Sequence, residues 1–321
     1  MKILVTGGAG FIGSHLCERL LLNGHNVTAI DDFSTGSFSN LATLQTSPDF
    51  TMIEGSILDV QTLAPLIEGA DYVFHLAAAV GVLNIINNPL ASLLTNIRGT
   101  ENVLAAAHAT KTPVFVTSSS EVYGKNVSNS LKESDDRILG SPVTLRWSYS
   151  EAKAIDESIA YAYFIERQLE TRIVRFFNTV GPRQLGAYGM VVPRFVKAAL
   201  TNEPVTIYGD GNQTRCFAHV YDVIDAVIAV AFANNTIGKV INIGNDFEIS
   251  INSLAKKIID ETGSKSRIVY VPYEEAYGDG FEDMERRVPN IELINKLVGW
   301  KPKRDLSTII SDISVEIRKN S

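Results

Sequence analysis

The sequence is poor in the residues on which several classes of protein depend. Its 321 residues include two cysteines, Cys17 and Cys216, which argues against a disulfide framework. The 29 lysines and arginines are outnumbered by 36 aspartates and glutamates, giving a net charge of −7. Because no basic stripe stands out, we expect no nucleic-acid partner. We also expect no metal site.

Long apolar stretches are missing as well. No uncharged apolar run reaches the roughly 18 residues that a membrane-spanning helix needs, so we expect no membrane segment. The first predicted strand begins at residue 2, which leaves no room for a signal peptide. A cytoplasmic location is therefore expected. The sequence is nevertheless 45% hydrophobic, enough for a sizeable core in one large or two modest domains.

What the chain does contain begins with a glycine-rich turn. Gly7, Gly10 and Gly13 follow the apolar run 3–5 and open a segment, residues 11–20, with helical periodicity. In a dinucleotide-binding βα unit, such glycines permit a tight turn, let the backbone approach a pyrophosphate and let the helix pack on the strand. The helix N-terminus supplies free N–H groups for the phosphates. The alternative is a turn whose glycines serve packing alone.

An acidic residue ends the next predicted strand. Residues 27–31 end in Asp31, which is placed to accept hydrogen bonds from an adenosine ribose. A carboxylate at this point repels a 2′-phosphate. The sequence therefore favours NAD over NADP as the cofactor.

Strands and helices alternate in the first half of the chain. Predicted strands cover residues 2–6, 26–31, 50–54, 71–75, 112–117 and 171–176, and predicted helices include 88–109 and 149–168. This alternation predicts an α/β fold of Rossmann type, with a doubly wound and mostly parallel sheet. Ligands bind such sheets at the carboxyl ends of the strands.

The pattern changes after residue 180. A helix at 221–233 and a strand at 239–243 indicate a return to the sheet, and further elements are expected at 251–262, at 267–271 and at the C-terminus. Residues 208–212 are expected to form a hairpin turn. We therefore predict an NAD-binding domain of residues 1–180 with returning segments at about 217–245, and a smaller domain within 181–321.

Two side chains suited to proton transfer lie at the start of a predicted helix. Tyr149 and Lys153 are four residues apart and so share a helix face. A free tyrosine, with a pKa of about 10, is a poor base at neutral pH, but a neighbouring ammonium favours the phenolate. Tyr149 could then take a proton from a hydroxyl while hydride leaves the carbon. The alternative is a surface pair, since this spacing is common by chance.

Hydroxyl groups follow another predicted strand, at residues 117–120. They can donate to the substrate oxygen that Tyr149 deprotonates. For Thr117 and Ser118 we favour a simpler interpretation, a polar turn capping the strand.

Together these motifs resemble the extended short-chain dehydrogenase/reductase family, the group of nucleotide-sugar epimerases, dehydratases and decarboxylases. The glycine turn, the serine-rich strand end and Tyr149-x-x-x-Lys153 carry the resemblance. Further matches run nearly the whole chain: His75-Leu76-Ala77-Ala78, Asn96-Ile97-x-Gly99-Thr100, Arg175-Phe176-Phe177-Asn178-x-x-Gly181-Pro182-Arg183, Gly209-Asp210-Gly211-x-Gln213-x-Arg215 and Asn242-Ile243-Gly244.

The resemblance implies a role for each matching position. The catalytic residues would be Tyr149, Lys153, Ser119 and Glu121. NAD would be bound by Gly7, Gly10, Phe11, Ile12, Gly13, Asp31, Asp32, Ile57, Asp59 at the adenine amine, Ala77, Asn96 near the nicotinamide ribose, and Lys153. The nucleotide sugar, held mainly by the smaller domain, would contact Ser120, Arg146, Asn178, Val192, Arg215 and Arg287. Helices 88–108 and 149–168 resemble the pair that forms a homodimer interface.

Other residues bear on the subgroup. Ser120-Glu121 is similar to the Ser-Glu pair of UDP-glucuronate decarboxylases, and the segments 146–153 and 277–289 resemble the decarboxylase domain of the aminoarabinose pathway. The resemblance implies oxidation of C4 of a UDP-sugar to a 4-ketose and favours decarboxylation of UDP-glucuronate. A UDP-sugar 4-epimerase, a 4,6-dehydratase and a non-catalytic NAD-binding sensor remain as alternatives. An arginine, Arg146 or Arg287, could pair with the sugar carboxylate.

Both residues that favour decarboxylation also have a simpler interpretation. Arg146 could form a surface ion pair. Glu121 could be a carboxylate that caps a turn or helix.

Overall fold

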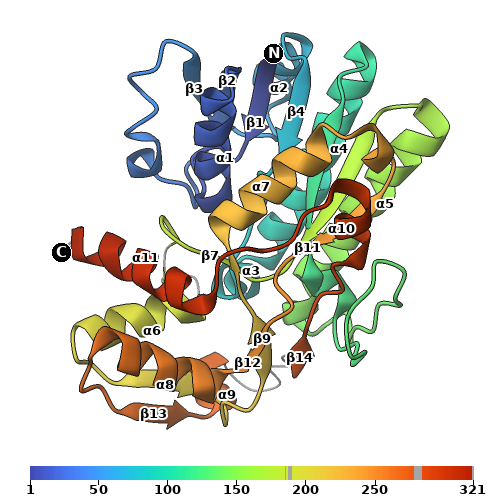
Figure 1. The fold of residues 1–321 in the computed structure, drawn as a ribbon. Coiled ribbons are helices and arrows are strands. Elements are labelled where there is room, and N and C mark those ends of the chain that lie inside the picture. The colour runs from blue at the N-terminus through green and yellow to red at the C-terminus, as the bar shows by residue number, and fades with distance from the viewer. Residues whose placement is uncertain (185, 187–189, 278–283, 320–321) are drawn as a thin grey trace.

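The computed structural model is organised around a parallel β-sheet with helices on both faces (Figure 1). It describes residues 1–184, 186, 190–277 and 284–319. Seven strands pair in the order β11-β6-β5-β4-β1-β2-β3, and all six pairings are parallel. Their bounds are Lys2–Thr6 (β1), Asn26–Asp31 (β2), Phe50–Glu54 (β3), Tyr72–His75 (β4), Val114–Ser119 (β5), Thr171–Phe176 (β6) and Val240–Ile243 (β11). The predicted fold class is confirmed.

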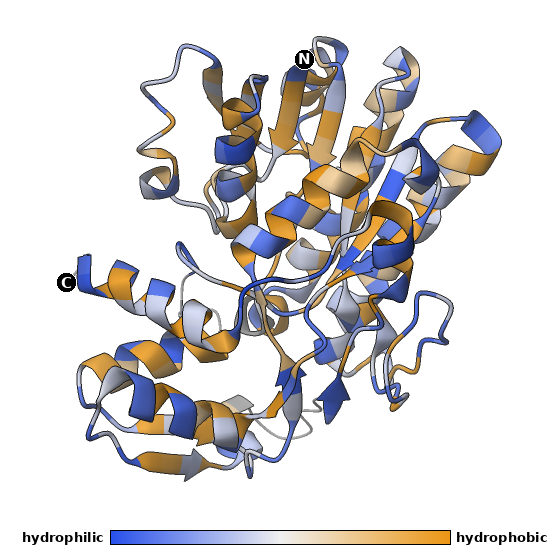
Figure 2. Ribbon diagram, viewed as in Figure 1, coloured by the Kyte–Doolittle hydropathy of each residue, from blue (hydrophilic) through white to orange (hydrophobic). Residues whose placement is uncertain are grey.

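Helices cover the two faces of this sheet. On one face α1 (Phe11–Leu22) packs against α7 (Val220–Ala231), and on the other α4 (Pro89–Thr110) packs against α2 (Val60–Glu68) and α5 (Ser148–Arg167). Strands buried on both faces need near-continuous apolar sequence. Figure 2 shows the hydrophobic colour on the strands of the central sheet. A short helix, α3 (Val82–Asn87), precedes α4.

A smaller cluster of elements lies beside the carboxyl ends of the strands, in the lower part of Figure 1. Strand β8 (Val205–Tyr208) pairs with β13 (Ile268–Val271), and α6 (Val191–Leu200), α8 (Ile251–Thr262) and α11 (Leu306–Lys319) pack around a separate apolar core. The remaining elements are β7 (Thr179–Val180), β9 (Thr214–Cys216), β10 (Ala218–His219), β12 (Glu248–Ser250), α9 (Tyr273–Tyr277), β14 (Arg286–Arg287) and α10 (Glu292–Val298). The separate cores support our proposal of two domains divided near residue 180.

The predicted elements agree with the structure to within two residues at most ends, but one turn differs. Residues 208–212 do turn, with Gly209 and Gly211 at φ +74° and +75°. They do not close a β-hairpin, because β8 pairs with β13 while β9 pairs with β12 and β14. The hairpin prediction is therefore wrong. A turn signal between two strands does not tell which partners the strands take.

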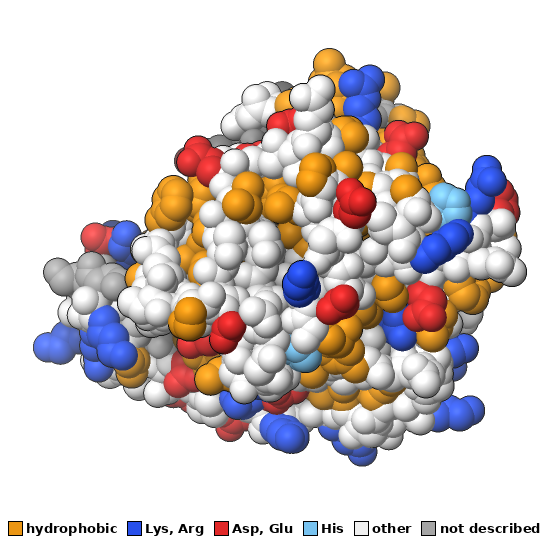
Figure 3. All heavy atoms as spheres, turned by 90° about the horizontal axis from the view of Figure 1, so that it is seen from above, with side chains coloured by type: hydrophobic (Ala, Val, Ile, Leu, Met, Phe, Trp, Pro, Cys, Tyr) orange, Lys and Arg blue, Asp and Glu red, His pale blue; other side chains and the backbone are white. Residues whose placement is uncertain are grey.

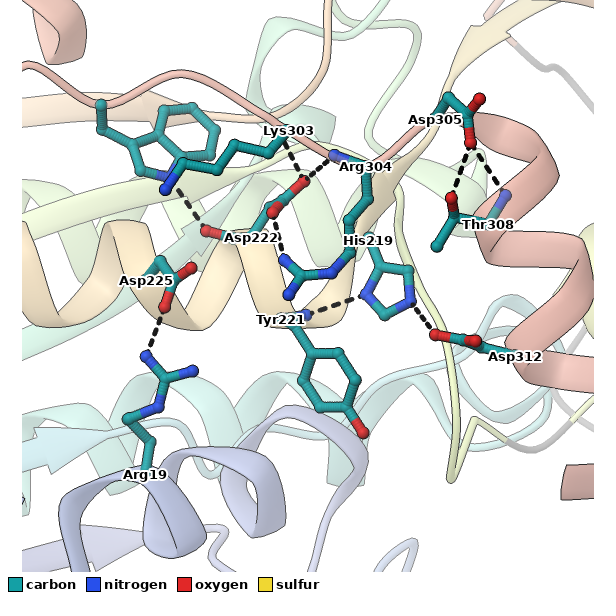
Figure 4. Close-up of polar contacts among 11 residues, drawn as sticks. Arg19, His219, Tyr221, Asp222, Asp225, Lys303, Arg304, Asp305, Thr308 and Asp312 are labelled. Atoms are coloured by element: carbon teal, nitrogen blue, oxygen red, sulfur yellow. Dashed lines mark hydrogen bonds and ion pairs between the residues drawn. The ribbon is translucent and has the colours of Figure 1, made fainter. Parts of the chain in front are cut away.

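The C-terminal segment is tied to α7 by a cluster of polar contacts (Figure 4). The Asp222 carboxylate accepts hydrogen bonds from the backbone N–H groups of Lys303 and Arg304, both at 2.8 Å, and Trp300 Nε1 donates to the Asp222 carbonyl at 3.0 Å. His219 lies 3.1 Å from the carboxylate of Asp312 on α11. These contacts fix the last helix against the sheet domain.

The described part of the chain has no helix long and apolar enough to span a membrane. Cys17 and Cys216 are free and buried. On the face shown in Figure 3, charged side chains of both signs are interspersed with apolar ones.

Candidate active site

A cleft of about 710 Å³ lies at the carboxyl ends of the strands. Its lining comes from the turn after β1, the ends of β2, β4 and β5, the first turns of α5, and loops of the smaller cluster. This is where a doubly wound sheet places its ligands. The predicted cofactor-binding turn and the predicted proton-transfer residues lie at the same site, because the glycine turn and the Tyr149 region both line this cleft.

The glycine turn is shaped by close backbone packing. Gly7 has φ +71°, and a Cβ there would lie 2.7 Å from the backbone nitrogen of Ala77. A Cβ on Gly13 would lie 2.0 Å from the Gly7 carbonyl oxygen. Gly10 caps α1 without a side-chain hydrogen bond, and Gly10, Phe11, Ile12 and Gly13 line the cleft. The helix N-terminus therefore offers backbone N–H groups to an anion, as the pyrophosphate of a dinucleotide requires.

Acidic groups lie where an adenosine ribose is expected. Asp31 and Asp32 both line the cleft. The Asp31 carboxylate also accepts from the backbone N–H groups of Ala9 and Phe33, each at 2.9 Å, so it braces the glycine turn. Burial raises the pKa of Asp31, and these backbone donors oppose the rise.

Four other predicted cofactor residues differ in position. Ile57 and Ala77 line the cleft, whereas Asp59 and Asn96 are not among its lining residues. The Asp59 carboxylate caps α2, accepting from the Gln61 N–H at 3.1 Å. Asn96 holds the loop at Ala79, accepting from its N–H at 2.7 Å. Contact of Asp59 with adenine and of Asn96 with a ribose stays a prediction.

The residues proposed for proton transfer meet at one point of the cleft. Tyr149, Lys153 and Ser119 all line it. Burial raises the pKa of Tyr149, and the carboxylates of Glu121 and Asp156 add to the rise, while a hydrogen bond from Ser119 opposes it. Ser119 also accepts from the backbone N–H of Glu121 at 3.2 Å.

Thr117 and Ser118 are held by contacts inside the protein. The Thr117 hydroxyl donates to the His75 carbonyl at 3.0 Å, and the Ser118 hydroxyl donates to Glu157 at 2.5 Å. Both residues lie within β5 and also line the cleft, so they form the polar end of the strand itself and not a turn that caps it.

A charged cluster forms one wall beside Tyr149. The Glu121 carboxylate accepts hydrogen bonds from both terminal guanidinium nitrogens of Arg146, one of them at 3.0 Å. It also accepts a hydrogen bond from Arg287 at 2.9 Å. Burial raises the pKa of Glu121, but the two arginines outweigh it and lower that pKa to about 2. Arg146 is only 6% exposed, so the alternative of a surface ion pair is wrong. Glu121 is likewise more than a capping carboxylate, because both arginines converge on it.

The proposed substrate residues other than Val192 line the cleft, and Asn178 contacts the charged cluster directly. The Asn178 oxygen accepts from Arg287 at 2.5 Å, and its amide donates to the Cys216 carbonyl at 3.0 Å. Ser120, Asn178, Arg215 and Arg287 line the cleft. Val192 is fully buried in the smaller core and is not among the lining residues, although Met190 and Val191 are.

The sequence analysis missed several polar residues that line the cleft. Arg183, Gln184, Arg194, Tyr208, Gln213 and Tyr273 also line the cleft. Arg194 stacks over the Tyr208 ring at 4.1 Å, and Gln213 donates to the Tyr273 hydroxyl at 2.8 Å. Gln213 and Arg183 stood within matched motifs, which could have identified them. Residues 278–283, part of the segment that suggested decarboxylation, lie outside the described residues.

Comparison with known proteins agrees with this geometry. The model of the NAD-dependent epimerase/dehydratase family matches residues 3–244. The chain is 41% identical to the UDP-N-acetyl-alpha-D-glucosaminuronate decarboxylase of Bacillus cytotoxicus, over 94% of this chain and 92% of that protein. It is 35% identical to UDP-glucuronic acid decarboxylase 1 of Xenopus tropicalis, over 94% of this chain and 68% of that protein.

Solved structures resemble the chain throughout its length. The UDP-glucuronic acid 4-epimerase of Bacillus cereus, in complex with UDP-glucuronic acid and NAD, matches with a TM-score of 0.90 and 30% identity, covering 100% of both chains. Pal from Bacillus thuringiensis matches with a TM-score of 0.91 and 31% identity, again covering 100% of both chains.

Proposed function

The chain belongs to the NAD-dependent epimerase/dehydratase family, and we propose that it decarboxylates a UDP-hexuronate through a 4-keto intermediate. It is an NAD-dependent enzyme of nucleotide-sugar metabolism. The relatives include decarboxylases of UDP-glucuronate and UDP-N-acetylglucosaminuronate as well as a UDP-glucuronate 4-epimerase. All three names share one substrate class, a UDP-sugar whose C5 carries a carboxylate.

The charge of the cluster around Glu121 carries the proposal. Arg146 and Arg287 bring two positive charges and Glu121 brings one negative charge. The trio therefore has one excess positive charge in a partly closed cleft, which a substrate carboxylate would neutralise. Arginine suits this task because its planar fork binds a carboxylate bidentately.

Arg287 is the better placed of the two arginines to change partners. Its contacts to Glu121 and Asn178 come from side chains that line the cleft, so a substrate group can replace them. Arg146 remains on Glu121 through two hydrogen bonds. In this arrangement Glu121 keeps its negative charge and holds the arginines in position.

The proposed reaction begins at C4 of the sugar. Tyr149 takes the proton of the C4 hydroxyl, and the positive charge of Lys153 favours the phenolate. When bound, NAD⁺ accepts the C4 hydride and later returns it. Ser119 donates a hydrogen bond to the C4 oxygen.

Oxidation at C4 makes the C5 carboxylate that of a β-keto acid. The C5–CO₂ bond then breaks, and its electron pair delocalises toward the C4 ketone. The resulting enolate takes a proton at C5, and return of hydride to C4 gives a UDP-pentose. The chain's own residues mainly hold the carboxylate and retain the ketose until the last step.

Product mass tests this proposal directly. The purified protein is incubated separately with UDP-glucuronate, UDP-N-acetylglucosaminuronate and UDP-glucose, and the products are separated by chromatography, which resolves epimers, and analysed by mass spectrometry. We expect a UDP-hexuronate to give a product that is lighter by the mass of CO₂. An inverted uronate of unchanged mass would establish a 4-epimerase instead, and absence of turnover with all three sugars would overturn C4 oxidation.

We also propose a cytoplasmic homodimer, in which α4 and α5 meet their counterparts. Ile155, Tyr161 and Ile165 of α5 are 41%, 47% and 56% exposed, an unusual apolar content for a free helix surface. The apolar side chains of Val103 and Leu104 on α4 are fully buried within the subunit and so cannot contribute to such an interface.

Sedimentation velocity at micromolar concentration tests the dimer. We expect the wild type to sediment as a dimer and Ile165→Lys to shift toward monomer. Tyr270→Lys, at an exposed position of the smaller cluster, is the control and should leave the dimer intact. A monomeric wild type would contradict the proposal.

A further inference from the structure

A second carboxylate contacts the Tyr149–Lys153 pair from inside the protein. Asp156 lies one turn beyond Lys153 on α5 and is fully buried. Lys153 Nζ donates to Asp156 Oδ2 and to the Thr117 carbonyl, each at 3.1 Å. An ammonium has three N–H bonds. Two are thus engaged by the protein, and one is left for a group in the cleft that Lys153 lines.

Burying this carboxylate is costly for the fold. Burial raises the pKa of Asp156, and the nearby Lys153 ammonium and Thr100 hydroxyl offset only part of the rise. Asp156 Oδ1 has no hydrogen-bond partner among the described residues. An apolar side chain would pack at this position without that cost. The carboxylate must therefore be explained by its effect on its neighbours.

A chain of hydrogen bonds leads from the cofactor-binding turn to Thr100, whose hydroxyl faces Asp156. The Ala77 N–H donates to the Thr6 hydroxyl at 3.2 Å, and that hydroxyl lies 2.8 Å from His75 Nδ1. His75 Nε2 lies 3.1 Å from the Thr100 hydroxyl, which in turn favours the charged form of Asp156. Because a carboxylate only accepts, every donor in the chain points toward Asp156.

This direction fixes the state of His75. The Thr100 hydroxyl lowers the pKa of Asp156, which requires its proton to face the carboxylate, so its oxygen accepts from a proton on His75 Nε2, and His75 Nδ1 accepts from Thr6. Burial and, to a smaller extent, the Lys153 charge lower the pKa of His75 to about 3, so the ring is neutral. The chain starts at Ala77, whose backbone packs against Gly7, and ends at Thr100, beside the carboxylate that binds Lys153.

The charges that face Tyr149 come from several elements. Glu121 and Asp156 raise the pKa of Tyr149, while the Ser119 hydrogen bond and the Arg146 charge lower it. Asp156 is thus one of two carboxylates that oppose ionisation of Tyr149, and the only one of the two bound to Lys153 in the described structure.

We propose that Asp156 is a positioning residue, which faces the end of the hydrogen-bond chain from the cofactor-binding turn, directs the Lys153 ammonium into the cleft and sets the pH at which Tyr149 becomes a base. The inference rests on the proposed roles of Tyr149 and Lys153 in C4 oxidation. It adds to them a residue whose action passes through Lys153.

Two substitutions separate charge from position. Asp156→Asn keeps a hydrogen-bond acceptor and removes the charge, whereas Asp156→Leu removes both. Glu157→Gln is the matched control, because this neighbouring buried carboxylate binds Arg175 and Ser118 instead of Lys153. Reduction of bound NAD by a UDP-sugar is followed in a single turnover across the pH range, so that loss of CO₂ plays no part in the readout.

Removing a negative charge lowers the pKa of Tyr149, so the acidic limb of the rate profile should move to lower pH. We expect a shift of about one pH unit in both Asp156 variants and none in Glu157→Gln. Asp156→Leu should also lower the plateau rate about tenfold with KM unchanged, as misorientation predicts. An unmoved limb in Asp156→Asn, or an equal shift in Glu157→Gln, would overturn the proposal.

A nuclear magnetic resonance measurement tests the chain without turnover. With labelled histidine in the protein as purified, we expect neutral His75 to carry its proton on Nε2. A proton on Nδ1 would mean that Thr100 donates to His75 and not toward Asp156, which would overturn the direction of the chain. If the wild type reduced no NAD with any UDP-sugar, the proposed function would fail, and this measurement would still decide the hydrogen-bond chain.

Discussion

Two carboxylates, the buried Asp222 and the partly buried Glu121, both bind arginine but differ in where their other donors come from. Asp222 accepts from two backbone N–H groups at 2.8 Å and from the Arg304 guanidinium (Figure 4). In the described structure, the Glu121 carboxylate accepts only from the side chains of Arg146 and Arg287. Glu121 lines the cleft, whereas Asp222 does not.

The difference separates a structural cluster from an exchangeable one. Backbone donors cannot leave without unfolding the segment that carries them, so Asp222 fixes the chain before α11. Side-chain donors beside a cleft can rotate toward a ligand, so Arg287 can leave Glu121. Similar ion pairs therefore serve the fold in one place and the chemistry in the other.

The largest expected effect lies at the cleft and leaves the fold intact. Tyr149→Phe removes the proposed base, and turnover should fall by 10²–10⁴-fold, about the contribution of general-base catalysis. NAD binding and the melting temperature should hardly change, since the hydroxyl adds little to ground-state binding. Steady-state kinetics, calorimetry and thermal melting check these outcomes. A variant that keeps more than about a tenth of the rate would contradict a general-base role.

The next effect should appear in stability and spare the chemistry. Asp222→Ala leaves Arg304 and two backbone N–H groups without their acceptor. We expect a loss of about 3 kcal/mol in the free energy of unfolding, measured by urea denaturation, with unchanged turnover per folded molecule. Asp225→Ala on the same helix breaks a more exposed pair with Arg19. This control should cost less than about 1 kcal/mol.

The charge of Glu121 should appear in the pH dependence of stability. Its pKa is lowered from 4.5 to about 2 in the folded protein. A lowered carboxylate pKa stabilises the fold above the unfolded value, and this stabilisation is lost as pH falls through the folded one. Wild-type stability should therefore drop between pH 4.5 and about 2 more steeply than that of Glu121→Gln. If the free energies of unfolding of the two proteins fell in parallel over this pH window, the arginines would not be holding Glu121.

The smallest expected effect concerns the cofactor. Asp31 should disfavour a 2′-phosphate, so Asp31→Asn should reduce the preference for NAD over NADP about tenfold, by roughly 1.4 kcal/mol. Asp49→Asn is the control, because this exposed carboxylate binds Asn26 and is not among the residues that line the cleft. Calorimetry with both cofactors provides the measurement. Equal wild-type affinity for NAD and NADP would refute the role of Asp31.

Local patterns predicted most of the sheet, because each strand and helix carries its own periodicity. The glycine turn, Asp31 and the Tyr149–Lys153 spacing depend on neighbours in sequence, and all lie at the cleft as expected. The pairing of β9 with β12 and β14 could not be predicted, since it depends on segments over 30 residues apart.

The interior partners were also beyond the sequence. Asp156 looked like any polar residue of a helix, and only the packed structure brings it to Lys153 together with Thr100 and His75. Arg146 gave no sign of its burial, because the pairing with Glu121 joins residues 25 positions apart. Such contacts arise from tertiary packing and leave no local signature.

The central claim is that Arg287 exchanges Glu121 for the carboxylate of the substrate. Calorimetric affinities for UDP-glucuronate and UDP-glucose, compared between the wild type and Arg287→Leu, test it most directly. The wild type should bind the uronate at least about tenfold more tightly, and the variant should lose that preference, a change of roughly 1.4 kcal/mol. An undiminished preference for the uronate in Arg287→Leu would contradict the account.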